Sequence, residues 1–466
     1  MQMQKVRLYR NCRGLVHYFT SWLVAFKATA LYFRKTTNQP TAISVEPNLL
    51  SRKQQYTGQL ICILGAIFYC YEFILRIIPG ILQSELSNAF GHISASTFGQ
   101  LSALYYFAYS PMQMPVGMLM DRFGPKRLLS IACLCCALGS WLFCDFTSIS
   151  LAGIGRFLVG FGSSFVFVGV LALATQWLPR RYFSLFAGIM TTIGMLGLVY
   201  GEVKITSLVT SIGLLPVMNI LIYIGVLLTI AIFIIVRDAP HGHKHISYTS
   251  FNLFCREVFA VLTSRSIWLV GGIGACIYTS LSVFGELWGK SYLEYAHHLT
   301  KTQAAHTMAF LFLGWAIGAP LSGYLSDRTG RRILPLVIGG IIACIAITVV
   351  LYVPFLSYTA LNIWILIYGI SSASEIIVFI MGKEYCESNL SGTVFATVNM
   401  IVTLGGVFLQ PLVGFLLDLP GDNKIINGER IYSLYDYKIA LSILPISLIV
   451  MLILLYILSL YRNKHN

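Results

Sequence analysis

The sequence predicts an all-α integral membrane protein with 12 transmembrane helices arranged as two pseudo-symmetric bundles of six. The 466 residues are 57% hydrophobic and only 11% charged, with a mean hydropathy of +0.76, which is typical of membrane proteins and not of soluble ones. Apolar runs long enough to cross a bilayer recur along the chain, and one polar segment divides them into two sets. A basic motif also occurs twice, at equivalent places in the two sets.

Each predicted span follows from an apolar run, because a membrane-spanning helix needs about 20 such residues. The 12 runs are 57–82, 94–118, 128–146, 149–175, 182–204, 213–236, 264–289, 302–325, 333–354, 357–381, 392–417 and 437–461. We therefore expect bundles at 57–236 and 264–461, a central cytoplasmic loop at 237–263 and a cytoplasmic tail at 462–466.

The first 56 residues differ from the rest. The stretch 15–33 is apolar but interrupted by His17 and Lys27, so a thirteenth span, an amphipathic surface helix and an unstructured tail are all open. It lacks the sustained apolar core and cleavage site of a signal peptide. We expect a cytoplasmic extension over 1–56, with a mis-assigned start codon as an alternative.

The basic residues predict the orientation in the membrane. The net charge is +14, and 24 Lys and Arg residues fall on one side of the predicted topology against six on the other. Because basic loops stay in the cytoplasm, both termini are expected there, in a bacterial inner membrane. The cysteines show no metal spacing and are read as small buried hydrophobic residues. The tract 241–245 contains three histidines but no acidic or Cys ligand nearby, so no metal is expected.

The repeated motif is the most specific signal. The second copy follows the first by 206 residues, and each stands between the second and third spans of its half. The first copy contains Gly117, Asp121, Arg122, Gly124, Lys126 and Arg127, and the second contains Gly323, Asp327, Arg328, Gly330, Arg331 and Arg332.

The residue types in the motif suit a latch between helices. Gly117 and Gly323 are expected to allow close helix approach, and the later glycine of each copy a tight turn. Asp121 and Asp327 end their helices, where a carboxylate can pair with Arg or Lys or accept from a neighbouring helix N-terminus. Such a contact can hold the two halves in one state and release them in another. A generic basic turn is the alternative, and two copies in register argue against it.

These residues resemble a known family. The pattern G-x-x-x-D-R-x-G-x-K/R is similar to the loop 2–3 motif of the major facilitator superfamily, and the second copy to its loop 8–9 counterpart. Residues 156–162 resemble its R-x-x-x-G-x-G motif, 177–188 its loop 4–5 motif, and 399–418 helix 11 of many solute importers. Over 57–461 the resemblance implies two halves that rock to give alternating access.

Two finer comparisons bear on the substrate. Drug/proton antiporters of the superfamily usually carry a Gly-Pro element in helix 5, and 188–201 has the glycines without the proline. Residues 71–79 and 105–117 are similar to carriers near the phagosomal nutrient transporter (Pht) group of intracellular bacteria. That resemblance implies amino acids or related nutrients as substrates.

Charged groups inside spans are candidate functional sites, because burying one costs about 2.5–3.5 kcal/mol on insertion scales. Glu72 and Arg76 share a helix face at a spacing of four, and Arg156 lies at a similar depth on another helix. We hypothesise a triad in which Glu72 binds Arg156, Arg76 or a proton, leaving an Arg for a substrate carboxylate. A fixed structural ion pair is the alternative.

Further polar groups in the spans are candidates for the solute or proton path. Glu375 follows three serines and could bind a proton or a substrate ammonium, or belong to a helix-packing cluster. Pairs formed by Glu286 with Lys290 and by Glu202 with Lys204 are expected to be solvated at outer helix ends. Candidate cavity-lining or helix-bridging side chains are Tyr105, Tyr109, Gln113, Asn399 and Gln410.

The sequence thus favours a secondary active importer, coupled to H⁺ and carrying a small polar nutrient such as an amino acid. No nucleotide-binding fingerprint is present, and no organic cofactor, metal or nucleic-acid partner is expected. The expected partners are the solute and the lipid bilayer, with the monomer as functional unit. A proton-antiporting drug or metabolite exporter is the alternative. A channel, a receptor and an enzyme are disfavoured, because the duplicated latch suits none of them and no catalytic constellation stands out.

Overall fold

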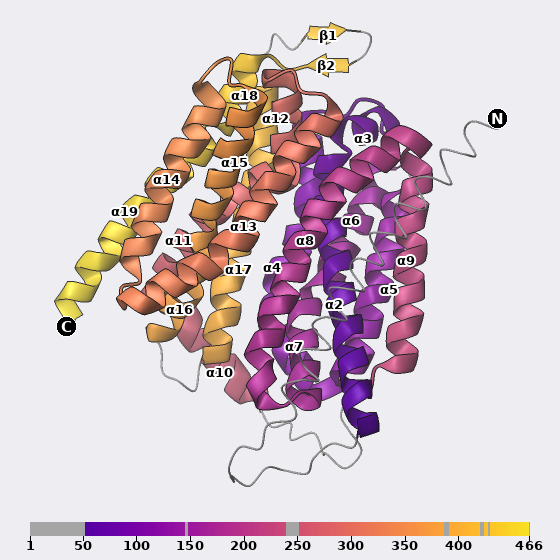
Figure 1. The fold of residues 1–466 in the computed structure, drawn as a ribbon, viewed down its shortest axis with the longest axis vertical. Helices are drawn as coiled ribbons and strands as arrows, with labels where there is room; N and C mark the ends of the chain where they lie inside the picture. The colour runs from indigo at the N-terminus through magenta and orange to yellow at the C-terminus, as the bar shows by residue number, and fades with distance from the viewer. Residues whose placement is uncertain are drawn as a thin grey trace. The chain divides into compact units, whose positions relative to one another are not determined.

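The computed structural model describes residues 52–144, 148–238, 251–385, 391–419, 424–426 and 429–465, and the chain there is almost entirely helical (Figure 1). The first 51 residues, including most of the predicted extension, and the histidine tract lie outside the described residues. A two-stranded antiparallel hairpin, β1 (Lys424–Ile426) and β2 (Glu429–Ile431), is the exception to the helical pattern within the described part.

The N-terminal half consists of the helices that precede residue 238. They are α2 (Arg52–Ile81), α3 (Gln83–Ala89), α4 (Ala95–Phe123), α5 (Pro125–Phe143), α6 (Ile149–Ser164), α7 (Val166–Trp177), α8 (Arg180–Ile212) and α9 (Leu214–Ile235). Short polar residues begin several of these helices. Ser94 accepts a hydrogen bond from the Thr97 amide at the start of α4, and Ser148 accepts one from Leu151 at the start of α6.

The C-terminal half repeats this order after a connecting helix, α10 (Phe251–Leu262), which lies inside the predicted central loop. Its elements are α11 (Arg265–Thr279), η1 (Ser280–Trp288), α12 (Gly289–Ala296), α13 (Lys301–Thr329), α14 (Ile333–Tyr352), α15 (Tyr358–Ser372), η2 (Ala373–Glu375), α16 (Ile376–Glu384), α17 (Ser391–Asp418), α18 (Leu434–Leu441) and α19 (Ile443–His465). The π-helical segment η1 joins α11 to α12 as one continuous span.

Eleven of the 12 predicted spans are helices long and apolar enough to cross a bilayer within the described residues. The remaining prediction, 94–118, corresponds to α4, which has 29 residues but no stretch of the length of a span that is as apolar as those of the other eleven. Many of its polar and aromatic residues, including Ser102, Tyr105 and Gln113, are buried against other helices, whereas Phe107 is 58% exposed. α4 is therefore an interior helix of the bundle, and its hydropathy reflects the polar interface that it lines.

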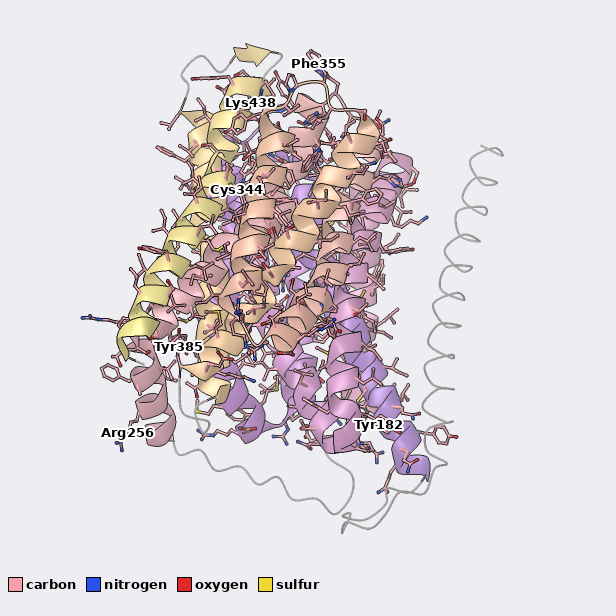
Figure 2. All side chains as sticks on the ribbon, turned by 60° about the vertical axis from the view of Figure 1, so that its left-hand side comes forward. Tyr182, Arg256, Cys344, Phe355, Tyr385 and Lys438 are labelled. Carbon is pink, nitrogen blue, oxygen red and sulfur yellow. The ribbon has the colours of Figure 1, made fainter. Side chains whose placement is uncertain are left out.

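The two halves pack along α4 and α17, and along α8 and α13 (Figure 1). Glycines make this approach possible at α17, because a Cβ at Gly406 would meet the Tyr106 ring at 2.6 Å and one at Gly414 would collide with the Ala95 carbonyl. We call the end of the bundle with α3, α12 and the strands the hairpin end, where Phe355 and Lys438 lie. The opposite end, marked by Tyr182, Arg256 and Tyr385, is the motif end (Figure 2).

Candidate functional site: a buried charge network between the halves

The predicted pair on α2 is formed. The Arg76 Nη2 atom lies 3.3 Å from Glu72 Oε2, and its Nε donates to the Tyr105 hydroxyl at 3.0 Å. Tyr105 in turn donates to Glu72 Oε2 at 3.2 Å. Glu72 and Arg76 are 1% and 5% exposed, so both charges are withdrawn from solvent and compensate each other within one half.

Arg76 also reaches the other half. Its Nη1 donates to the Tyr278 hydroxyl on α11 at 3.3 Å and lies 4.0 Å from Glu286 Oε1 on η1. Glu286 accepts a short hydrogen bond from Tyr106 on α4. One guanidinium thus lies between a carboxylate of its own half and a carboxylate of the other half.

Arg156 occupies a neighbouring position but binds differently from the prediction. It donates to the carbonyl oxygens of Leu75 at 3.0 Å and Arg76 at 3.4 Å, so it holds the backbone of α2 and not the Glu72 carboxylate. Its charge lies 5.1 Å from the centre of the Tyr105 ring, and its buried Nε has no hydrogen-bond partner among the described residues. Of the partners predicted for Glu72, the structure shows Arg76 and not Arg156, because peptide carbonyls accept the hydrogen bonds of the Arg156 guanidinium.

Aromatic rings enclose the network. Tyr105 and Tyr109 stack with centroids 5.6 Å apart, and the Arg76 guanidinium lies 4.5 Å from the Phe73 ring centre and 5.2 Å from that of Tyr109. On the other side Trp315 packs edge-on against Tyr278, and its buried indole N–H has no partner among the described residues. Ring faces stabilise a desolvated cation without neutralising it, so the Arg76 charge stays available to an anion.

The four buried ionisable groups comprise two carboxylates and two guanidinium groups. If all are ionised they sum to zero, the arrangement that a low-dielectric interior tolerates best. Glu286 Oε1 has no hydrogen-bond partner among the described residues. Within the described residues, the network therefore has one acceptor, Glu286 Oε1, and one donor, Arg156 Nε, without a hydrogen-bond partner. The acceptor suits a proton and the donor suits an anion.

The predicted helix-bridging amides link helices. Asn399 on α17 donates to Gln113 on α4 at 2.9 Å, and Gln113 donates to the Tyr109 carbonyl at 3.4 Å. Gln410 donates to the Ser282 carbonyl at 2.6 Å, which ties α17 to η1 within the C-terminal half. The Asn399–Gln113 hydrogen bond connects the two halves on the motif-end side of the charge network. Gln410 binds η1, the segment that contains Glu286.

The predicted exposure of three other charged residues is wrong, and the predicted role of Glu375 stays a prediction. Glu286, Lys290 and Glu202 were expected to be solvated, yet each is at most 5% exposed. The physical reason is that the spans continue to Ala296 and Ile212, several residues beyond the predicted ends, and carry these charges into the bundle. Glu375 is buried and forms no ion pair within the described part of the chain.

The two motif copies form turns as expected but bind different partners. Gly124 and Gly330 have φ of +82° and +62°, which favours glycine. In the second copy Arg332 pairs with Asp327 at 2.6 Å and Glu384 at 2.8 Å, and these carboxylates raise the pKa of Arg332 by hydrogen bonding. In the first copy Asp238, which follows the end of α9, accepts from the Lys126 amide at 2.6 Å. Asp238 therefore binds the N-terminus of α5.

Gly117 and Gly323 do not mediate close helix approach in this structure. A Cβ at either position would meet no heavy atom within 4 Å. The prediction of close packing there is wrong for this state, because no helix of the opposite half lies against these glycines.

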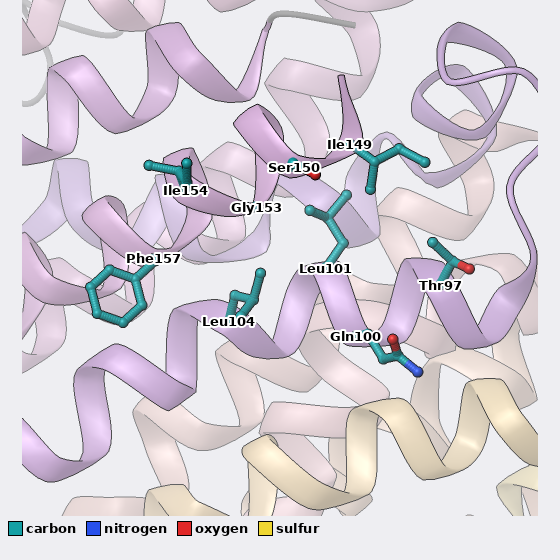
Figure 3. Close-up of a pocket in the computed structure, with 9 residues that line it drawn as sticks. All are labelled: Thr97, Gln100, Leu101, Leu104, Ile149, Ser150, Gly153, Ile154 and Phe157. Atoms are coloured by element: carbon teal, nitrogen blue, oxygen red, sulfur yellow. The ribbon is translucent and has the colours of Figure 1, made fainter. Parts of the chain in front are cut away.

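A groove of about 470 Å³ lies between α4 and α6, on the far side of α4 from the interface with α17 (Figure 3). Its lining is mostly apolar, with Thr97, Gln100 and Ser150 near the starts of the helices and Leu104 and Phe157 further along them. It contains no charged side chain, so it does not compete with the buried network as a site for a polar solute.

Sequence reasoning missed Tyr278 and misplaced Glu286. The repeat contained a signal for the first, since Tyr278 stands 206 residues after Glu72, the same offset that separates the motif copies. Residues at equivalent positions of inverted or parallel repeats converge on the interface between them. No comparable signal marked Glu286, whose burial depends on where the helix ends. No cluster of three metal-ligating residues occurs in the described ranges.

Comparisons with known proteins agree with this architecture. A family model described as Major Facilitator Superfamily matches residues 61–410. The chain is 22% identical over 284 residues to a probable sulfoacetate transporter of Cupriavidus necator, covering 59% of this chain and 65% of that protein. It is 24% identical to a gentisate transporter of Corynebacterium glutamicum, covering 76% and 80%.

A solved structure is also similar. It is the crystal structure of a bacterial homologue of the human lysosomal transporter Spinster, in an inward-facing and unoccupied conformation. It matches with a TM-score of 0.67 at 18% identity, covering 88% of this chain and 97% of that one. At this identity the match supports the fold of two six-helix halves.

Proposed function

Because the chain belongs to the Major Facilitator Superfamily, we propose that it imports a small polar nutrient with a carboxylate group, an organic acid or an amino acid, together with protons. The protein is an integral multi-pass membrane transporter and not an enzyme. The proposal adds that it works by alternating access, as a monomer in a bacterial inner membrane with both termini in the cytoplasm. The finer resemblance to the Pht group stays a prediction.

One observation carries the proposal: Arg76 is shared between Glu72 of its own half and Glu286 of the other half. An anionic group that binds Arg76 would compete with these carboxylates for the same donors. The displaced carboxylate would then be buried without a countercharge, and taking up a proton relieves that cost. Substrate binding and proton binding are therefore coupled by charge balance.

The charge balance also predicts stoichiometry. A monoanion added to a network of zero net charge requires one proton, so its transport with one proton is electroneutral. A zwitterion can place its carboxylate on an arginine and its ammonium on Glu72 or Glu286, so any proton carried with it would move net charge. The two similar transporters are named for sulfoacetate and gentisate, both organic anions, which supports an anionic substrate.

The test is uptake by purified protein in liposomes with an imposed pH gradient. Sulfoacetate, gentisate and a panel of amino acids serve as the labelled probes, after a thermal-shift screen with the same compounds. We expect uptake of one chemical class, driven by an inwardly directed proton gradient, and loss of that drive in Glu286→Gln with exchange of substrate retained. Uptake that ignores the proton gradient, or stabilisation by lipophilic cations alone, would contradict the proposal and favour an exporter.

A further inference from the structure

A second buried charge cluster lies toward the hairpin end, next to the Arg76 network along the chain, since Lys290 is four residues after Glu286. Lys290, on α12 of the C-terminal half, inserts its side chain into the N-terminal half. Its Nζ donates to the carbonyl oxygen of Ile81 at 2.7 Å and to the Thr206 hydroxyl at 2.9 Å. Lys290 is 5% exposed, so an ammonium group of one half is buried among oxygen atoms of the other.

The oxygen atoms around Lys290 suit a cation. Ile81 is the last residue of α2, so its carbonyl lies at the helix C-terminus, where the helix dipole favours positive charge. Thr206 and Glu202 are four residues apart on α8 and therefore share a face. A backbone carbonyl, a hydroxyl and a carboxylate form a ligand set that binds hard cations.

Glu202 is the member of this set with unused capacity. Its side chain is 2% exposed, and Oε1 has no hydrogen-bond partner among the described residues. Glu202 lies one helical turn before Thr206, to which Lys290 donates, yet Glu202 and Lys290 form no direct ion pair in the described structure. An ammonium has three donors, and the hydrogen bonds to Ile81 and Thr206 use two of them. The oxygen atoms of Ile81, Thr206 and Glu202, which we call the oxygen cage, thus include one acceptor, Glu202 Oε1, that the Lys290 ammonium does not use.

We propose that Ile81, Thr206 and Glu202 form a monovalent-cation site in the N-terminal half, and that Lys290 is its tethered occupant in this structure. When the hairpin end opens, Lys290 leaves with the C-terminal half, and a free Na⁺ or K⁺ ion takes its place. That exchange rests on the proposed alternating access, whereas the site itself rests on the oxygen cage. A cation held there stabilises the open state that Lys290 cannot stabilise.

Removal of the tethered ammonium tests the site without requiring transport. In Lys290→Met the aliphatic stem remains while the charge is lost. The melting temperature of the purified variant is measured while NaCl or KCl replaces choline chloride at constant ionic strength. We expect Na⁺ or K⁺ to raise the melting temperature by roughly 2 °C or more, since a ligand that binds only the folded state stabilises it. The wild-type protein should not respond, because its site is filled.

Two further variants define the ligands. Glu202→Gln combined with Lys290→Met should abolish the cation response. Lys301→Met is the matched control, because it removes another lysine that links the halves at the same end but is 42% exposed, and it should show no preference for Na⁺ or K⁺ over choline. If Lys290→Met does not fold, Lys290→Ala takes its place, since it also removes the ammonium group and leaves the oxygen atoms of Ile81 and Thr206 without an occupant.

Three outcomes would overturn the site. The first is that Lys290→Met has equal melting temperatures in Na⁺, K⁺ and choline, and the second is that the cation response survives in the double variant without Glu202. The third is that acidification alone restores the melting temperature of Lys290→Met, which would mean that Glu202 only takes up a proton. These results are distinguishable from failure of the proposed function, because proton-driven uptake is measured separately on the wild-type protein. Uptake without a cation response would contradict only the cation site, and a cation response without uptake would contradict only the proposed function.

Discussion

The hairpin end and the motif end hold the two halves together by different means. At the hairpin end, polar groups of one half bind polar groups of the other directly. These links are Lys290 to Ile81 and Thr206, Lys301 to Glu85, Ser291 to Gln83, the Ser96 amide to Asp418, and the Ala95 amide to Tyr432. At the motif end, the cross-half links that we find among the described residues are the Asn399–Gln113 hydrogen bond and the stacked rings of Phe167 and Phe395.

The motif loops reinforce this contrast. Within each half, the backbone amide of Lys126 donates to Asp238, and the Arg332 side chain pairs with Asp327 and Glu384. The hairpin end is closed by contacts between halves, whereas the motif end is organised by contacts within them. Under the proposed alternating access these roles would exchange during the cycle, so each end should respond differently to the same kind of substitution.

Gly80→Ala should give the largest effect. A Cβ at Gly80 would collide with the Glu286 carbonyl, so α2 and η1 cannot keep their present separation. We expect a loss of about 1–3 kcal/mol in the free energy of unfolding, the usual cost of overpacking, with faster hydrogen–deuterium exchange in α3 and α12. Differential scanning fluorimetry and exchange mass spectrometry measure the two effects.

The matched control for Gly80→Ala is Gly323→Ala at the motif end. A Cβ there meets nothing within 4 Å, so helix propensity alone should raise stability by up to about 1 kcal/mol. Equal destabilisation by both variants would contradict the contrast between the ends.

Gly323→Leu separates stability from transport. The space around Gly323 is open in this structure, so the variant should be at least as stable as the wild type, with a gain of up to about 1 kcal/mol from helix propensity. Closure at the motif end would bring another helix against this position, and the leucine should then lower uptake by tenfold or more. Liposome uptake at equal protein content is the measurement, and wild-type uptake would show that the motif end never packs at this glycine.

The spans were predictable from sequence because hydropathy is a local property, and the Glu72–Arg76 pair was predictable because helix geometry sets its spacing. The ends of the spans were not predictable from sequence, because a helix continues as long as its backbone hydrogen bonds and packing allow. That error placed Glu286 and Glu202 in solvent, although the helices bury both. The tie from Arg76 to Glu286 joins residues far apart in the chain, and no local pattern specifies it.

The motif shows the same limit. The turns of the motif were predictable from its glycines. The residue that binds the α5 N-terminus was not predictable, because Asp238 lies more than 100 residues after the motif in the chain. In the second copy Arg332 pairs with Asp327, and in the first copy the backbone amide of Lys126, the residue equivalent to Arg332, donates to Asp238. Repeat symmetry therefore predicts the turns of the two loops but not the contact with Asp238.

Asp238→Ala should have a moderate effect confined to the motif end. The substitution leaves the Lys126 amide at the start of α5 without its acceptor, which costs about 1 kcal/mol for a typical helix cap. Asp327→Asn is the comparison in the second copy. Asp327 is 67% exposed, so loss of its ion pair should change stability by no more than a few tenths of a kcal/mol. Thermal melts of both variants test this order, and a larger loss in Asp327→Asn would reverse the assignment of the two contacts.

Acidification should weaken the hairpin end slightly and through one link. Burial opposes ionisation of Glu85, but hydrogen bonds from Lys301 and Ser84 outweigh it and lower the pKa of Glu85. A carboxylate whose pKa is lower in the folded state stabilises that state at neutral pH, and the contribution is lost as the pH falls through the folded pKa. Because Lys301 is 42% exposed, solvent screening limits the effect to a few tenths of a kcal/mol.

The measurement for Glu85 is amide exchange in α3 as the pH is lowered below 5, corrected for the intrinsic rate. Protection should fall in the wild type and should already be reduced, with less dependence on pH, in Lys301→Met. Lys290 links the same two halves through neutral acceptors, so its contacts with Ile81 and Thr206 should persist over this range. If Lys301→Met keeps the full acid response of α3, the response comes from another carboxylate, and the Glu85 link contributes nothing to closure at this end.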